Sequence, residues 1–153
     1  MFDKFGEFDS VEELNLAAEG LFNEGDFDSI RVLAGENGIQ EDFVQMYLDG
    51  DIPELADTSM AAMGKIDTEL PEAQKQYDMA AVCIAEYIKS LCDREAFARA
   101  VRRKGKRLED CLRNMQAYAR KQVKKETGCQ CVCIQPSAGF KMVQDYYMKE
   151  EQA

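Results

Sequence analysis

Residues 93–125 read DREAFARAVRRKGKRLEDCLRNMQAYARKQVKK and carry 12 of the 19 lysines and arginines of the chain. Apolar residues recur along this stretch at spacings of three and four, which is typical of amphipathic helices. They are Phe97, Ala100 and Val101 in the first part and Leu108, Cys111, Leu112, Met115 and Tyr118 in the second. Gly105 lies between the two groups. The stretch therefore predicts two helices joined by a basic turn, with the basic side chains facing water or a partner.

The same helical spacing recurs through most of the chain. Ser10 and Glu13 have the spacing of a capping box at a helix start, Gly25 is placed to end that helix, and Asp26 is placed to cap the next. A period of two, typical of extended chain, occurs only around residues 129–134. The sequence predicts an all-α, compact domain of about seven to eight helices. We expect short N-terminal helices packed on longer C-terminal helices, with at most one short extended segment near residues 129–134.

Two prolines indicate further helix starts, because proline fits the first position of a helix. Pro53 is predicted to begin the fourth helix and Pro71 a later one, and residues 64–71, GKIDTELP, are predicted to form a hinge. We therefore expect an acidic N-terminal helical subdomain over residues 1–66. The C-terminal helical subdomain, with the basic helix pair, should cover residues 67–153, and the two should fold as one unit.

The charges are divided unevenly along the chain. Residues 1–80 contain 20 acidic and four basic side chains, a net charge of −16, whereas residues 81–153 contain nine acidic and 15 basic ones, a net charge of +6. Two interpretations stay open. In the first, the two halves attract each other or simply solvate opposite faces of the molecule. In the second, the acidic half offers a surface resembling nucleic acid to a basic partner.

Several classes of active site are excluded by composition. The chain has no histidine, so it lacks the commonest general base and metal ligand, and catalytic triads with histidine are impossible. The glycine at residue 105 has no partner glycine at the spacing of a phosphate-binding loop. We expect a protein that is not an enzyme and that has no cofactor.

The sequence also bears on the compartment of the protein. No run of 18 apolar residues is present, and the first residues do not form a secretory signal. Six cysteines without an export signal are typical of reduced thiols. We therefore expect a cytoplasmic protein that makes no membrane contact, and the sequence leaves the oligomeric state open.

Cys129, Cys131 and Cys133 are a candidate metal site. Zinc and iron–sulfur sites usually pair CxxC units, in which a tight turn brings both sulfurs to one metal. In an extended segment these three side chains would share a face at steps of about 6.6 Å, which is too wide for one ion without a bend. Ordinary thiols are the main interpretation, and a metal site is the alternative.

The basic turn carries the clearest functional signal. Guanidinium groups suit phosphate geometrically, and these residues are candidates for binding nucleic acid or another anion: Arg99, Arg102, Arg103, Lys104, Lys106 and Arg107. The structural alternative is that cations at a helix C-terminus are favoured by the helix dipole, and aromatic residues for base stacking are missing from the cluster.

Three stretches carry a resemblance to a known family. They are residues 21–56, LFNEGDFDSIRVLAGENGIQEDFVQMYLDGDIPELA; residues 91–115, LCDREAFARAVRRKGKRLEDCLRNM; and residues 142–148, MVQDYYM. They resemble PcfK-like proteins of conjugative elements, some of which are grouped with anti-CRISPR proteins that inhibit the type II RNA-guided nuclease. The resemblance covers most of the chain and contains no catalytic signature.

The resemblance implies a protein that acts by binding. Its partner would be a type II CRISPR-Cas nuclease, whose channel for nucleic acid is positively charged. The contact would use either the acidic surface formed by Glu41, Asp42, Asp49, Asp51 and Glu54 or the basic helix on the guide RNA or target DNA. The alternatives are a conjugation accessory protein that binds DNA or a transfer complex, and a helical scaffold for protein interactions.

Overall fold

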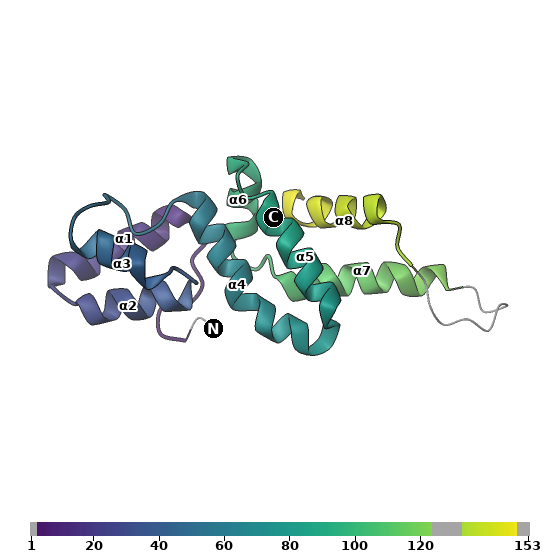
Figure 1. Ribbon diagram of the computed structural model, residues 1–153, viewed down its shortest axis with the longest axis horizontal. Coiled ribbons are helices and arrows are strands. Elements are labelled where there is room, and N and C mark those ends of the chain that lie inside the picture. Colours follow the sequence, from purple (N-terminus) through teal and green to yellow (C-terminus); the bar gives the residue numbers. More distant parts are fainter. Residues whose placement is uncertain (1–2, 124–132, 150–153) are drawn as a thin grey trace.

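A computed structural model describes residues 3–123 and 133–149 and confirms the all-α fold (Figure 1). Its helices are α1 (Val11–Glu24), α2 (Phe27–Glu36), α3 (Glu41–Leu48), α4 (Thr58–Tyr77), α5 (Met79–Ser90), α6 (Glu95–Arg102), α7 (Leu108–Gln122) and α8 (Pro136–Met148). No strand occurs in the described residues. Most of the predicted extended segment, residues 129–132, lies outside them.

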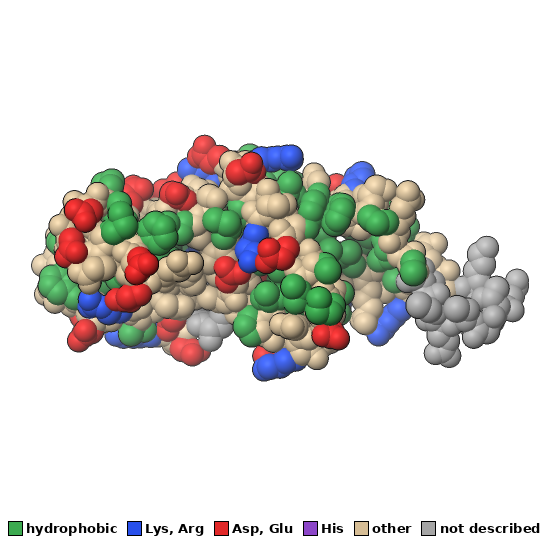
Figure 2. All heavy atoms as spheres, in the orientation of Figure 1, with side chains coloured by type: hydrophobic (Ala, Val, Ile, Leu, Met, Phe, Trp, Pro, Cys, Tyr) green, Lys and Arg blue, Asp and Glu red, His purple; other side chains and the backbone are tan. Residues whose placement is uncertain are grey.

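Helices α1, α2 and α3 form a group at one end of the molecule (Figure 1). The local signals for these helices are confirmed: the Ser10 hydroxyl accepts a hydrogen bond from the Glu13 N–H, Gly25 ends α1 in the left-handed conformation, and Asp26 caps α2. Their core is built from Leu14, Ile30, Leu33, Val44 and Leu55, together with Tyr47, Ile39 and several smaller residues. Acidic and apolar side chains mix on the outer surface of this end (Figure 2).

The long helix α4 runs from this group into the rest of the molecule (Figure 1). It begins at Thr58 and not at Pro53, because the Asp57 carboxylate accepts the Met60 N–H at 2.7 Å, whereas the residue before Pro53 has no side-chain acceptor. It also continues through Pro71. The predicted helix starts at Pro53 and Pro71 and the predicted hinge at residues 64–71 are therefore wrong.

The helix continues through residues 64–71 because its packing outweighs the hydrogen bond that Pro71 cannot donate. Ile66 and Ala73 are buried on one face of α4, and α5, α6 and α7 pack against this helix. Pro71 itself is exposed. The hydrophobic cluster of the α1–α3 group ends at Ala61 and the second cluster begins at Ala62, so one helix contributes to both cores without a linker.

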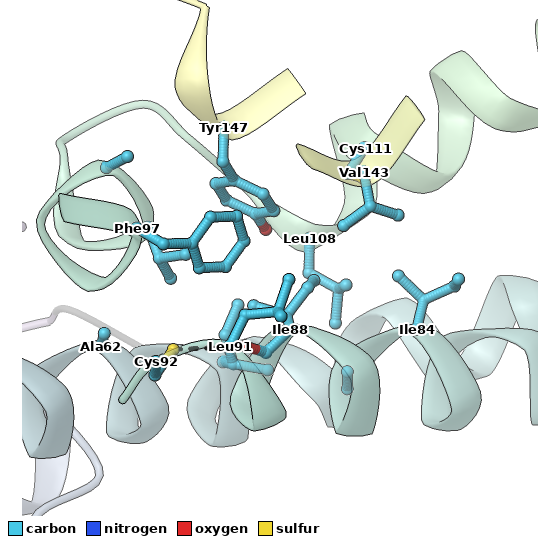
Figure 3. Packing of buried hydrophobic residues seen from close by; sticks show 14 of the residues in the cluster. Ala62, Ile84, Ile88, Leu91, Cys92, Phe97, Leu108, Cys111, Val143 and Tyr147 are labelled. Atoms are coloured by element: carbon cyan, nitrogen blue, oxygen red, sulfur yellow. Dashed lines mark hydrogen bonds between the residues drawn. The ribbon is translucent and has the colours of Figure 1, made fainter. Parts of the chain in front are cut away.

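The second core lies among α4 to α8 (Figure 3). Ile88 and Leu91 project from the α5 side toward Phe97 and Tyr147, whose rings meet edge to face with centroids 5.9 Å apart, and Ile84 lies on the side of Val143 and Cys111. All of these side chains are at most 8% exposed. Tyr147 ties the last helix to the rest of the fold, because α8 packs on α5, α6 and α7.

Two glycines make the closest approach between the α1–α3 group and α4. Gly38 has a φ of +68°, and Gly64 lies in the second turn of α4. A Cβ built on Gly64 would lie 2.2 Å from the Asn37 carbonyl oxygen, and one on Gly38 would lie 2.3 Å from the Gly64 oxygen. Only glycine on both sides allows the two backbones to touch here.

Candidate functional site

The structure separates the six predicted anion-binding residues into two kinds. Arg99, Arg103, Lys104 and Arg107 are exposed, whereas Arg102 is 1% exposed and Lys106 is 7% exposed. The loop 103–107 between α6 and α7 therefore presents part of its charge to solvent and turns the rest inward.

Arg102 faces the interior, so its predicted role as a surface anion contact is wrong. Its Nη2 donates to the Asn37 side-chain oxygen at 2.8 Å, while its Nε and Nη1 find no hydrogen-bond partner in the described residues. Burial lowers the pKa of Arg102, and the carboxylates of Glu7 and Glu69 oppose this effect. Position 102 is the last residue of α6, on the side that meets the α2–α3 turn.

Lys106 is also a structural residue, which corrects its predicted role. Its Nζ donates to the carbonyl oxygens of Tyr146 at 3.3 Å and Lys149 at 3.0 Å, and it lies 5.2 Å from the centre of the Tyr146 ring. Tyr146 lies in the last turn of α8 and Lys149 is its C-cap, so the cation satisfies free acceptors and the helix dipole at this helix end. Lys106 therefore fastens the end of α8 to the basic loop.

Carboxylates of the acidic N-terminal segment bind the backbone of the same loop. The Glu7 carboxylate accepts the Gly105 N–H at 3.3 Å and pairs with Lys65 at 2.7 Å, and Asp9 accepts the Lys104 N–H at 3.0 Å. Arg99 pairs with Glu12 at 2.6 Å. The uneven charge distribution of the chain is thus partly an internal contact, in which carboxylates of the N-terminal segment hold the loop in place.

Behind this contact lies a buried group of charges that the sequence analysis missed. Lys65 is completely buried and donates to the Arg103 carbonyl as well as to Glu7, and Glu69 is 5% exposed and accepts the Leu108 N–H at 2.7 Å. The sequence contains one indication of this group. Lys65 and Glu69 are four residues apart, so they lie on the same face of α4, next to the apolar Ile66. Their burial cannot be predicted from the sequence, because it depends on contacts with residues that are distant along the chain.

The environment moves the pKa of each member of the group. Burial lowers the pKa of Lys65 and raises that of Glu69, and the attraction between these two side chains opposes both shifts. Burial would raise the pKa of Glu7 too, but the hydrogen bond and charge of Lys65 outweigh it, so the pKa of Glu7 is lowered. Glu69 also has one oxygen, Oε1, without a hydrogen-bond partner in the described residues.

We expect Glu69→Gln to change how stability depends on pH. The raised pKa of Glu69 means that its contribution is fully present below its ordinary value of 4.5 and is lost as the pH rises through the folded-state pKa. Glutamine keeps an acceptor for Leu108 and does not titrate. The variant should therefore gain stability relative to wild type as the pH rises, measured by urea unfolding from about pH 4 to 8.

Glu24→Gln, which changes an exposed side chain at the end of α1, is the matched control. If the free energy of unfolding differs between Glu69→Gln and wild type by the same amount at every pH, the raised pKa of Glu69 is contradicted.

The predicted acidic surface lies on α3 and the loop before α4. Glu41 is engaged by Arg31 at 2.9 Å, and Asp49 accepts a hydrogen bond from Gln45. Asp42, Asp51 and Glu54 are exposed and make no ion pair with any residue that the structure describes. These carboxylates remain accessible, in contrast to the buried Arg102 and Lys106.

The cysteines do not form a site in the described part of the chain. Cys129 and Cys131 lie outside it and Cys133 is exposed, so the predicted metal alternative remains a prediction. Within residues 3–123 and 133–149, no group of three His, Cys, Asp or Glu side chains is placed to hold a metal ion. Burial raises the pKa of Cys92 and Cys111 to about 12, so these two thiols stay protonated.

None of the described helices has the length and apolar character needed to cross a membrane.

Comparison with protein-family models, curated proteins and solved structures finds no match to this chain.

Proposed function

We propose that this protein is a non-enzymatic binding protein of a mobile genetic element, which inhibits a type II CRISPR-Cas nuclease through its acidic α1–α3 end. The observation that carries the choice of surface is the accessibility of Asp42, Asp51 and Glu54, set against the burial of Arg102 and Lys106. The resemblance to PcfK-like proteins supplies the class of partner. Carboxylates at this end would occupy the positively charged surfaces with which such a nuclease holds its nucleic acid.

Charge reversal of the accessible carboxylates tests the proposal. We expect a variant with Asp42→Lys, Asp51→Lys and Glu54→Lys to lose inhibition by at least about tenfold, because like charges facing each other across an interface are strongly unfavourable. The measurement is cleavage of a plasmid by the nuclease and its guide RNA, with increasing amounts of the protein.

The matched control neutralises exposed basic residues instead. Arg103→Gln with Lys104→Gln should leave inhibition within about twofold of wild type, since exposed charges outside the interface contribute little to binding. If neither variant alters inhibition, or if the wild-type protein does not inhibit cleavage, the proposal in this form is wrong.

The second candidate function is that of a conjugation accessory protein that binds DNA. It is favoured by the exposed side chains of Arg103, Lys104, Arg120 and Lys121, which have no acidic partner among the residues described. DNA affinity that falls steeply with salt in a gel-shift series, and that Arg103→Gln with Lys104→Gln weakens, would favour this function over nuclease inhibition.

A further inference from the structure

We propose that a groove beside α1 is the anchor point of the acidic end and that it binds a basic amphipathic segment of a partner protein. The groove has a volume of about 480 Å³ and is lined by Glu12, Asn15, Leu16, Glu19, Tyr47, Pro53 and Glu54. This volume is within the range of ligand-binding clefts in proteins. The inference rests on the proposed function, in which this end of the molecule makes the contact.

The lining of the groove includes apolar side chains that solvent reaches. Leu16 is 66% exposed, more than any other large hydrophobic side chain of the described residues. Tyr47 forms a buried wall of the groove and is only 9% exposed; its ring is 5.6 Å from that of Phe22, which lies 5.6 Å from that of Phe27. Phe22 and Phe27 are both more than a third exposed. The groove thus offers the exposed Leu16 side chain to another molecule, with two further exposed aromatic rings next to its buried Tyr47 wall.

The rim of the groove has one sign of charge. Glu12, Glu19 and Glu54 line it, and no lysine or arginine does. Glu12 is engaged by Arg99, whereas Glu19 and Glu54 have no ion pair within residues 3–123 and 133–149. Glu19 and Tyr47 line the groove together, and burial and the charge of Glu19 raise the pKa of Tyr47. Phosphates would be repelled here, so the occupant is a cationic protein segment and not a nucleic acid.

The groove is already formed in the free protein. The Asn15 side chain donates to the Ala56 carbonyl at 2.9 Å and accepts the Ala56 N–H at 3.1 Å. This pair of hydrogen bonds fastens the loop that carries Pro53 and Glu54 against α1, and the neighbouring Leu55 is completely buried. Because the two walls are held in position, a partner would not have to order them on binding.

Apolar lining and acidic rim together select the chemistry of the occupant. An isolated cation would satisfy Glu19 and Glu54 but leave Leu16 in water. A segment with leucine-like side chains on one face and arginines beside them would cover Leu16 and pair with both carboxylates, and arginine does so with fixed, bidentate geometry. The structure therefore favours a basic amphipathic helix over a polyamine or a purely basic tail.

The probe is a labelled synthetic helix with leucines on one face and arginines on the other, and binding is followed by fluorescence anisotropy. We expect wild-type protein to bind it, and we expect Leu16→Asp to weaken binding at least about tenfold, because loss of a central apolar anchor has a large effect. Glu19→Lys with Glu54→Lys should weaken it by a similar factor.

Two controls separate a specific groove from general attraction of charge. Glu72→Lys with Asp145→Lys makes the same change in net charge at exposed positions on α4 and α8, and it should stay within about twofold of wild type. A probe in which every leucine is replaced by serine should bind at least about tenfold more weakly. Equal binding of the two probes, equal effects of the two charge-reversed variants, or no binding of the leucine–arginine helix would overturn the proposal.

The same variants distinguish this inference from the proposed function. Nuclease inhibition that persists in Leu16→Asp would overturn the groove as the anchor and leave the proposed function standing. Specific binding of the helix without inhibition of the nuclease by wild-type protein would reject the proposed function and support the groove. Self-association of the wild-type chain that Leu16→Asp abolishes, measured by sedimentation, would overturn the choice of a partner protein as the occupant.

Discussion

Gly64→Ala should destabilise the protein by about 3 kcal/mol, because a methyl group at this position overlaps backbone atoms. The added Cβ would lie 2.2 Å from the Asn37 oxygen and 3.0 Å from the Gly38 oxygen. Backbone cannot rotate out of the way as a flexible side chain does, so α4 would have to move away from the α2–α3 turn. The free energy of unfolding, measured by urea denaturation, checks this result.

Gly20→Ala is the matched control for this prediction. Gly20 lies within α1, and a Cβ at this position would meet nothing within 4 Å. Alanine favours a helix over glycine by about 0.5–1 kcal/mol, so this variant should be slightly more stable than wild type. A loss of stability in Gly64→Ala with a gain in Gly20→Ala would establish the close approach. Changes in the free energy of unfolding with the same sign would contradict it.

The effect of Gly64→Ala should also reach the basic loop. Asn37, whose carbonyl would be displaced, holds Arg102 through its side-chain oxygen and donates to the Leu33 carbonyl through its Nδ2. Displacement of this residue would leave the buried guanidinium of Arg102 without its one described hydrogen bond. A buried charge that loses its partner adds to the loss of stability.

Lys65→Met should cost about 3 kcal/mol or more, because it removes the lysine that pairs with Glu7 and donates to the Arg103 carbonyl. Lys65 is completely buried, and the Glu7 side chain is 8% exposed, so water replaces the lost contacts poorly. Methionine fills a similar volume, which keeps the effect of a cavity small. Thermal or urea unfolding measures the loss.

A second substitution tests whether the cost comes from the unpaired carboxylate. Glu7→Gln keeps an acceptor for the Gly105 N–H and removes the charge, so Lys65→Met with Glu7→Gln should recover a substantial part of the stability lost in Lys65→Met alone. If the two substitutions are simply additive, the ion pair is not the source of the effect.

The pH dependence of the Lys65→Met variant should follow from the lowered pKa of Glu7. A carboxylate with a depressed folded-state pKa contributes stability above its ordinary value of 4.5 and loses it as the pH falls through the folded-state pKa. The difference between Lys65→Met and wild type should therefore shrink in acid. A difference that grows as the pH falls would show that another group dominates.

The local signals in the sequence were sufficient for both ends of α1 and for the start of α2, but not where packing competes with them. Ser10, Gly25 and Asp26 act through atoms within a few residues of themselves, so their roles follow from the sequence. Pro53 and Pro71 carry an equally local preference for a helix start. At Pro71 the buried face of α4 overrides that preference, and at Pro53 the cap at Asp57 does.

In the basic stretch 93–125, too, local patterns predicted some features of the candidate site and long-range packing decided the others. Its helical spacing placed the basic turn correctly between α6 and α7. It did not distinguish the exposed Arg103 and Lys104 from the buried Arg102 and Lys106, because burial is decided by Asn37 and by the end of α8, which are far away along the chain. Spacing reports which residues share a face of a helix, and not what that face meets.

By itself, then, the sequence determined the all-α class, the basic turn and the acidic character of the first half, because helix periodicity, capping and net charge are local or additive properties of residues. Only the tertiary structure decided that Glu7 and Asp9 hold the loop 103–107, that Lys65 and Glu69 are buried, and that Leu16 and Glu54 share a groove. Contacts between residues distant in the chain depend on how the helices pack, and each such contact determines whether a given charge is neutralised inside the molecule or left for a partner.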